Sequence, residues 1–173
     1  MHGAGRTDTA RDFRYTPSAL IDKIAQALSP ETIILKIILD PCAALERRFQ
    51  FAGRNWTTRG LSRAWAAHSV FVNPPGSNGG VGKWATKFAA EFKADNFDRG
   101  AFLFFNHDHS TKAFKTIMRL NPMQVLLCDR WKFPDPRGKL YEVGRSQTLA
   151  FVGVAYGRVL SVFKNIGYTV HGG

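Results

Sequence analysis

Two short motifs in this sequence place a polar side chain and proline directly after an apolar run. The run "KIILDP" ends at Asp40-Pro41, and the run "SVFVNPP" ends at Asn73-Pro74-Pro75. The Asn73 side-chain oxygen accepts hydrogen bonds, and the Pro74 carbonyl is a second acceptor, held stiffly because proline fixes its backbone angle. Two convergent acceptors can orient an exocyclic amino group so that its nitrogen lone pair points at an electrophile. A plain turn is the simpler alternative, since Asn-Pro and Pro-Gly are turn dipeptides.

Apolar periodicity indicates which elements position these motifs. Residues 1–13 are predicted to form a flexible arm, and residues 14–173 a single domain. Strands alternate with helices along that domain, which favours an α/β fold: a compact, mainly parallel sheet with helices on both faces and an antiparallel strand near the C-terminus. The predicted helices are 18–28, 42–53, 83–94 and 110–120, and the predicted strands are 32–41, 69–73, 100–105, 124–129 and 148–156.

In an open parallel sheet, ligands bind beyond the carboxyl ends of the strands. Asp40 and Asn73 both follow such ends, so we expect them at one rim of the sheet. A carboxylate and an amide at one rim suit a pocket for two substrates.

The charge of the chain is strongly positive. Its 24 Lys and Arg residues against 13 acids give a formal net charge of +11, which favours polyanionic partners such as nucleic acid. The excess is uneven: between residues 41 and 90 the only acid is Glu46, whereas that stretch carries the bases Arg47, Arg48, Arg54, Arg59, Arg63, Lys83 and Lys87. A solvated basic surface without a partner is the alternative interpretation.

Several classes of protein are not indicated. The N-terminus lacks the apolar segment of a secretory signal and no apolar run is long enough for a membrane span, so we expect a cytoplasmic protein without a membrane partner. Cys42 and Cys128 lack paired metal-ligand spacing, and no metal site is predicted. The stretch "NHDH" at 106–109 contains two candidate metal ligands, His107 and His109, but a polar loop is the favoured interpretation of this stretch. "GSNGGVGK" at 76–83 resembles a phosphate-binding loop, but Trp84 follows where Ser or Thr is needed.

The order of motifs resembles that of phage-type, Dam-like DNA adenine-N6 methyltransferases. That family shows a Thr-Pro near its start, an Asp-Pro-Cys-Ala after the first strand, and an Asn-Pro-Pro-aromatic-Ser followed by a Trp-bearing helix. The corresponding stretches are "YTPSAL" (15–20), "LDPCA" (39–43), "FVNPPGS" (71–77) and "KWATK" (83–87), with "DRWKF" and "LAFVGV" downstream. The resemblance covers roughly residues 14–155.

This resemblance implies a Rossmann-like class I methyltransferase fold that uses S-adenosylmethionine to methylate the N6 amino group of adenine in DNA. The target base would be flipped out of the helix. Catalysis would fall to Asn73, Pro74 and Pro75. The cofactor would be bound by Asp40, which holds its amino group, and by Tyr15, Thr16, Pro17, Pro41, Cys42 and Ala43. DNA would be contacted by Arg54, Arg59, Gly76, Ser77, Lys83 and Trp84.

The chain departs from the family pattern at three places. Gly76 stands where relatives place the aromatic ring that stacks on the flipped adenine, so another ring must replace it, the candidates being Trp84, Phe105 and Trp131. Arg59 begins "RGL" where relatives carry an acidic Asp-Gly-Leu. The short spacing between Asp40 and Asn73 leaves room for one helix, so a compact domain with low sequence specificity is expected. A catalytically weak or inactive relative that binds nucleic acid through its basic face is the alternative. The sequence leaves the target motif and the oligomeric state open.

Overall fold

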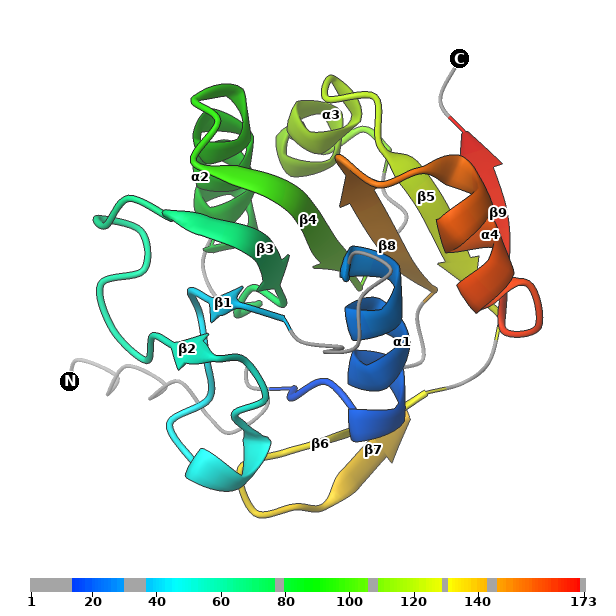
Figure 1. Cartoon of the computed structure of the whole chain (residues 1–173). Coiled ribbons are helices and arrows are strands. Elements are labelled where there is room, and N and C mark those ends of the chain that lie inside the picture. The colour runs from blue at the N-terminus through cyan, green and yellow to red at the C-terminus, as the bar shows by residue number, and fades with distance from the viewer. Residues whose placement is uncertain are drawn as a thin grey trace, which may run out of the picture.

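The structure, a computed structural model, describes residues 14–29, 37–76, 80–105, 109–128, 131–142 and 146–171. The predicted arm at 1–13, Ser77 and His107 lie outside these residues. Figure 1 shows the arrangement of the elements. The helices are α1 (Ser18–Leu28), α2 (Gly80–Lys93), α3 (Lys112–Met118), α4 (Tyr156–Phe163) and the short 3-10 helix η1 (Arg47–Phe49). The strands are β1 (Leu39–Asp40), β2 (Arg54–Asn55), β3 (Ala67–Val72), β4 (Phe97–Phe104), β5 (Met123–Leu127), β6 (Lys132–Pro134), β7 (Leu140–Glu142), β8 (Gln147–Val152) and β9 (Gly167–His171).

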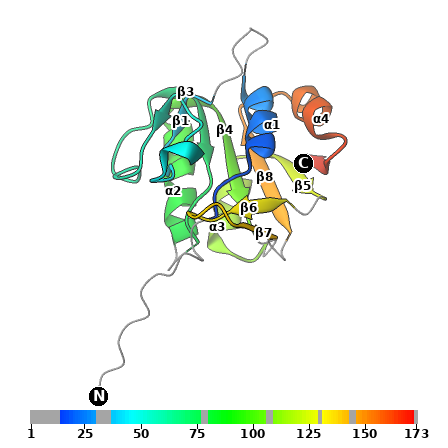
Figure 2. The same ribbon diagram turned by 90° about the horizontal axis from the view of Figure 1, so that it is seen from below.

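Within the described residues, seven strands form one sheet in the order β2-β1-β3-β4-β8-β5-β9. The pairs β1-β2, β1-β3 and β3-β4 are parallel. Strand β8 lies antiparallel between β4 and β5, and β9 is antiparallel to β5 at the edge. The mostly parallel sheet with late antiparallel strands confirms the predicted α/β class. Strands β6 and β7 form a separate hairpin across one end of the molecule (Figure 2).

Helices cover both faces of the sheet, as predicted. Successive side chains of a strand point to opposite faces, so neighbouring residues of one strand pack against different helices. On β3, Phe71 belongs to the apolar cluster that contains α1 and α4. Its neighbours Val70 and Val72 belong to the cluster formed with α2 and α3. The two helix pairs lie on opposite sides of the sheet in Figure 1.

Helix α1 has the bounds that periodicity predicts. Its buried side chains recur at helical spacing from Leu20 to Leu28, and Pro17 precedes its first turn with an extended backbone. Helix α3 begins at a capping residue, because the Thr111 hydroxyl oxygen accepts a hydrogen bond from the Phe114 N–H at 3.2 Å. Within the described ranges, each helix is too short or too polar to serve as a membrane span.

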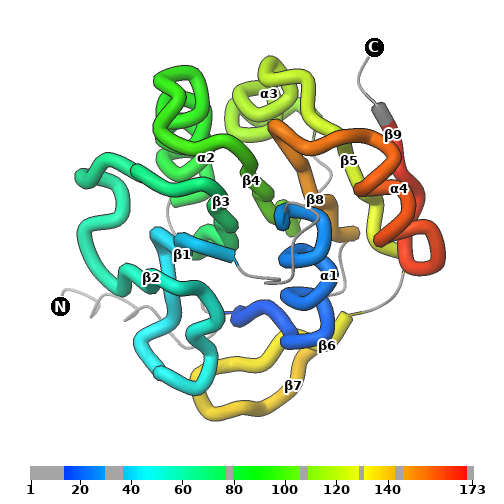
Figure 3. The backbone as a smooth tube through the Cα atoms, viewed as in Figure 1, coloured from blue at the N-terminus to red at the C-terminus, as the bar shows by residue number. Residues whose placement is uncertain are grey.

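The predicted helix at 42–53 is wrong. Figure 3 shows the chain between β1 and β3 as a long excursion that passes through β2. Its helical part is the short η1, and β2 is a strand of two residues. Tertiary hydrogen bonds replace helical ones: the Ala43 N–H donates to the Trp56 carbonyl at 3.0 Å and the Trp56 N–H to the Asp40 carbonyl at 2.9 Å. These bonds hold the excursion against the end of β1.

Candidate functional site

A cavity of about 860 Å³ opens at the carboxyl ends of β1 and β3. This volume lies in the upper part of the range of ligand pockets. Strand β2 pairs with one edge of β1, and β3 pairs with the other edge. The connection that leaves β1 and the connection that leaves β3 therefore run in opposite directions across the sheet. Such a topological switch point is where open α/β sheets bind ligands. The walls come from residues 14–16, 40–45, 56–62 and 73–76, with further side chains from η1, α2 and the β6-β7 hairpin and from Phe51 and Phe105.

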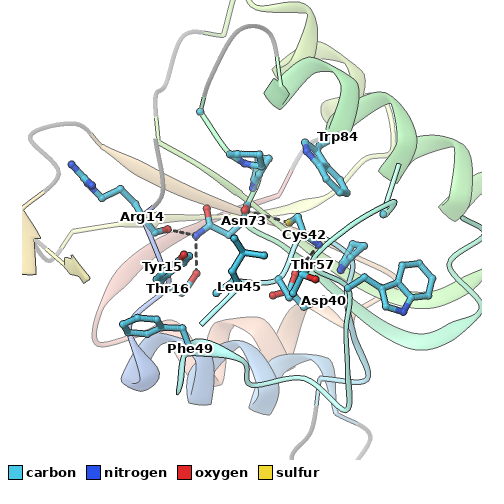
Figure 4. A pocket seen from close by; sticks show the side chains of 18 of the residues that line it. Arg14, Tyr15, Thr16, Asp40, Cys42, Leu45, Phe49, Thr57, Asn73 and Trp84 are labelled. Atoms are coloured by element: carbon cyan, nitrogen blue, oxygen red, sulfur yellow. Dashed lines mark hydrogen bonds between the residues drawn. The ribbon is translucent and has the colours of Figure 1, made fainter. Parts of the chain in front are cut away.

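Asn73 stands at the centre of the cavity, directly after β3 (Figure 4). Its side-chain Nδ2 donates to the Arg14 carbonyl oxygen at 2.7 Å and to the Thr16 Oγ1 at 3.0 Å. Both amide protons are therefore engaged, which fixes the orientation of the side chain. Among the described residues, nothing donates a hydrogen bond to Asn73 Oδ1 or to the Pro74 carbonyl oxygen. The site thus keeps two acceptors for a ligand that carries hydrogen-bond donors.

Asp40 ends β1 and is buried, with only 5% of its surface exposed. One carboxylate oxygen, Oδ1, accepts a hydrogen bond from the Cys42 N–H at 3.0 Å. Burial raises the pKa of Asp40 from 3.8 to about 7, and the Cys42 hydrogen bond opposes part of that rise. Within the described part of the chain, no Lys, Arg or His forms an ion pair with it. A buried carboxyl without a cation fits the ammonium group of a ligand.

Cys42 joins the two strand ends. Its Sγ donates to the Asn73 carbonyl oxygen at 3.3 Å. Burial raises the pKa of the Cys42 thiol well above its ordinary value, and the nearby Asp40 charge raises it further. The thiol therefore stays protonated and serves as a donor. This contact links the segment after β1 to the end of β3, and both Asp40 and Asn73 line the same cavity.

Tyr15 forms part of the cavity wall and is hydrogen-bonded to Glu46. The Tyr15 hydroxyl donates to Glu46 Oε2 at 2.5 Å, and its ring packs against Phe49 with the ring centroids 4.6 Å apart. Burial raises the pKa of Tyr15 above its ordinary range, and the hydrogen bond to Glu46 and its negative charge raise it further. Tyr15 is therefore a neutral wall residue, and the Glu46 charge is engaged by its hydroxyl.

Most of the predicted site residues meet in this cavity. All three predicted catalytic residues line it, and so do Tyr15, Thr16, Asp40, Pro41, Cys42, Ala43, Arg59, Gly76 and Trp84. Pro17 lies instead at the start of α1 and lines a neighbouring cavity. Arg54 and Lys83 are exposed and lie outside the cavity wall. The Arg54 guanidinium donates to the Ala66 carbonyl oxygen.

The three candidate stacking rings have different positions. Trp84 lines the cavity but is buried, and it stacks on Trp65 with the ring centroids 6.1 Å apart. Phe105 also lines the cavity and lies edge-on to Phe133. Trp131 packs against the core cluster on the α1 side of the sheet. The cavity wall therefore contains two of the three rings.

Sequence analysis missed several wall residues: Leu45, Phe49, Phe51, Trp56 and Tyr141. Leu45, Phe49 and Phe51 fall in the segment wrongly predicted to be a helix. Tyr141 lies on β7, outside every helix and strand predicted from the sequence, and the Arg14 guanidinium lies 4.3 Å from its ring centroid. No local signal predicts Tyr141, because its distance from Asn73 depends on where the hairpin docks.

Gly60 lies close to the backbone that follows β1. A Cβ built on Gly60 would lie 1.8 Å from the Pro41 carbonyl oxygen and 2.7 Å from Trp84 Cη2. The neighbouring Arg59 has a left-handed backbone with φ of 59°. The Gly60 carbonyl oxygen also accepts a hydrogen bond from Trp65 Nε1 at 2.7 Å. The backbone of this loop is therefore fixed against the end of β1, beside Asp40.

We expect Gly60→Ala to lower the free energy of unfolding by about 1–3 kcal/mol, because the added methyl group must displace backbone. Urea denaturation measures this change. Gly76→Ala is the matched control, since a Cβ at Gly76 would meet nothing within 4 Å. Equal stability of the two variants would contradict the close packing of Gly60 on Pro41.

No protein-family model matches this chain, and no curated protein matches it significantly. The interpretation of the cavity therefore depends on the residues and geometry described above.

Proposed function

We propose that this protein transfers a methyl group from S-adenosylmethionine to the N6 amino group of adenine in DNA. The observation that carries the proposal is the orientation of Asn73. Its Nδ2 is held by Arg14 and Thr16, which leaves Oδ1 and the neighbouring Pro74 carbonyl oxygen as acceptors in the same cavity as the buried Asp40 carboxyl. An exocyclic amino group presents two N–H donors, which matches two acceptors.

The fold supports this proposal. A mostly parallel sheet with helices on both faces and late antiparallel strands is compatible with the Rossmann-like class I methyltransferase fold that the motif order implies. Asp40 and Asn73 follow adjacent parallel strands, β1 and β3, and so lie at the same rim. A shared rim of this kind supports the proposal, because open α/β sheets bind ligands beyond the carboxyl ends of their strands.

The residues present fit the donor molecule at its charged end. Asp40 would hold the ammonium group of the methionine moiety, and its carboxyl would ionise as that cation replaces water. Thr57, which lies beside Asp40 in Figure 4, and Thr58 and Trp56 line the adjoining wall and would contact the adenosine moiety. When bound, S-adenosylmethionine supplies an electrophilic methyl group.

Catalysis by the chain's own residues would consist of orientation. Asn73 Oδ1 and the Pro74 carbonyl oxygen would accept the two N–H donors of the amino group and direct its lone pair toward the methyl group. The same acceptors would stabilise the positive charge that develops on the nitrogen, because they present partial negative charge to it. The nitrogen would then lose one proton to solvent water, and S-adenosylhomocysteine would be the second product. No covalent enzyme intermediate is needed, since positioning alone contributes a large rate factor.

The decisive experiment combines a transfer assay with a binding assay. The protein is incubated with labelled S-adenosylmethionine and unmethylated DNA, and the nucleosides are analysed. We expect N6-methyladenine in the product and measurable cofactor binding by calorimetry. Failure to form N6-methyladenine, together with undetectable cofactor binding, would exclude the enzyme.

Arg59 and Gly76 favour a second candidate function, a nucleic-acid-binding protein with weak or no catalytic activity. Arg59 is an exposed cation at the cavity wall and pairs with no acid among the described residues. Gly76 contributes no ring. Retained DNA binding without cofactor binding in the experiment above would support this second function.

The variant Gly76→Phe tests how much the absence of an aromatic ring at this position lowers kcat/KM for methyl transfer. A Cβ at Gly76 would meet nothing within 4 Å, so the cavity mouth accepts a larger side chain. A stacked ring contributes roughly 1–3 kcal/mol per base, and we therefore expect kcat/KM for methyl transfer to rise roughly fivefold or more. Gly76→Leu is the control, because it adds apolar volume without a ring. An equal gain in both variants would contradict stacking as the cause.

A further inference from the structure

A second cavity adjoins the first. Its volume is about 500 Å³, and it is lined by the start of α1, by η1 and by the β6-β7 hairpin. Three residues, Thr16, Phe49 and Phe51, line both cavities. The two hollows are therefore neighbours along one face of the molecule, with a largely aromatic wall between them.

Phe49 is the central residue of that wall. It ends η1 and is half-buried, with Tyr15 against its ring on the side of the first cavity. The Arg48 guanidinium lies 4.8 Å from the Phe49 ring centroid. Arg48 Nη2 also donates to the Pro136 carbonyl oxygen at 2.8 Å, which ties η1 to the hairpin. Phe49 is thus an oriented ring with a fixed cation beside it.

Charge around the second cavity favours an anionic ligand. Arg48 and Lys132 line it, whereas Asp22 is the acidic residue of its wall among the described residues. The hairpin adds Arg137 and Lys139, both exposed. Of its acids, Asp135 accepts hydrogen bonds from the backbone N–H groups of Arg137 and Lys139 at 2.9 Å, and Glu142 lies 3.9 Å from Lys132, so that this pair carries no net charge.

The same pairing of ring and cation recurs around the first cavity. Arg14 lies over Tyr141, and Arg63 lies 5.1 Å from the ring centroid of Trp56, while both rings line the cavity. Proteins bind single-stranded nucleic acid with aromatic rings, on which the bases stack, and with neighbouring cations, which contact the phosphates. In a duplex, by contrast, the neighbour of a flipped base stays stacked and paired, and could not enter a second cavity.

We propose that the substrate is single-stranded DNA, and that the second cavity holds the nucleotide next to the target adenine, with the packed rings of Tyr15 and Phe49 between the two bases. This inference rests on the proposed function and extends it. Arg48 and Lys132 contact the phosphates that join the two nucleotides. Gly76 is consistent with such a substrate, because a base that is already unpaired requires less stacking energy to hold it outside a helix.

Fluorescence anisotropy without cofactor tests the proposal. The probes are a labelled single strand with one adenine among thymines, its duplex, and single strands with an abasic site on either side of the adenine. We expect the intact single strand to bind roughly tenfold or more tightly than the duplex. An abasic site on one side should weaken binding roughly fivefold or more.

Phe49→Leu and Arg48→Gln assign the effect to the second cavity. Phe49→Leu should remove most of the difference between the intact and the abasic strand, because the stacking ring is gone. Arg48→Gln should weaken every single strand and reduce the salt dependence of binding. Tyr168→Leu and Arg119→Gln are the matched controls: Tyr168 is 73% exposed on β9, and Arg119 is exposed at the end of α3. Neither control should change affinity.

Three results would overturn the proposal: a duplex bound as tightly as the single strand, abasic sites without effect on either side, or the same abasic penalty in Phe49→Leu as in the parent. If the expected binding results are obtained but no N6-methyladenine forms, the proposed methyl transfer is wrong. The proposed nucleotide site in the second cavity is then still supported.

Discussion

Asn73→Ala is expected to reduce methyl transfer by about 10³-fold while leaving DNA affinity nearly unchanged. The substitution removes Oδ1, one of two acceptors for the amino group, and leaves the Pro74 carbonyl oxygen alone. Loss of one preorganised polar group at a reacting centre typically costs about 10²–10³-fold in rate, and a misplaced nucleophile adds to that loss. DNA affinity should persist because contacts to phosphates dominate it.

The assay for Asn73→Ala measures kcat/KM with labelled cofactor and DNA affinity by anisotropy on the same preparation. Thr16→Val is the matched control. It removes one of the two acceptors that hold Asn73 Nδ2 but keeps Oδ1 in the cavity, so its loss of activity should be much smaller. A variant that loses most of its DNA affinity, or one that keeps normal transfer, would contradict the role given to Asn73.

Asp40→Asn is expected to weaken binding of S-adenosylmethionine at least about 100-fold near pH 8. The variant keeps an oxygen that can accept the hydrogen bond from the Cys42 N–H, so local structure should be preserved. It removes the negative charge that would pair with the donor's ammonium group. Breaking a buried charge pair by removing one partner costs roughly 3–5 kcal/mol. Calorimetry measures the change in Kd.

The pH dependence of cofactor binding gives the same hypothesis a second test. With a pKa of about 7, the Asp40 carboxyl is protonated in the free protein below that pH. An ammonium ligand must then displace this proton, so affinity should fall roughly tenfold for each pH unit below 7. Asp40→Asn should show weak binding without this dependence. Tight, pH-independent binding to both proteins would remove Asp40 from the site.

Asp40→Asn should also stabilise the protein at alkaline pH. The folded-state pKa, about 7, lies above the ordinary value of 3.8, so between these values the folded protein holds a proton that the unfolded chain has lost. Stability therefore falls as pH rises through this window, by up to about 4 kcal/mol in total. Urea denaturation should find the variant more stable than the parent near pH 8, with the difference shrinking toward pH 4. A less stable variant near pH 8 would contradict this cost of burial.

The opposite effects of Asp40→Asn on stability and binding have one cause. A carboxyl that is buried without a cation destabilises the protein in the absence of a ligand, and a cationic ligand removes that cost. Asn73 differs, because its amide is neutral and its Nδ2 already has protein partners. Its contribution should appear in the rate of transfer and not in cofactor affinity.

The sequence by itself determined the α/β class, the bounds of α1 and the location of two polar motifs after buried strands. These follow from local rules: helical and strand periodicities differ, and proline ends an apolar run. The rim shared by Asp40 and Asn73 also followed, because parallel neighbouring strands present their carboxyl ends at the same edge. The proposed roles of both residues remain predictions.

Only the tertiary structure decided what surrounds those motifs. Residues 42–53 are apolar enough for a helix, but the Ala43 N–H donates to the Trp56 carbonyl oxygen and the Gly53 N–H to the Ile37 carbonyl oxygen, so both ends of the segment are bonded to other parts of the chain. Tyr141 and Phe49 lie far apart in the sequence, yet both line the first cavity because the hairpin docks against η1 through Arg48. Contacts over such separations leave no periodic pattern in the sequence. The two motifs could therefore be read from local order, whereas the walls of the cavity, the orientation of Asn73 and the neighbouring second cavity required the folded chain.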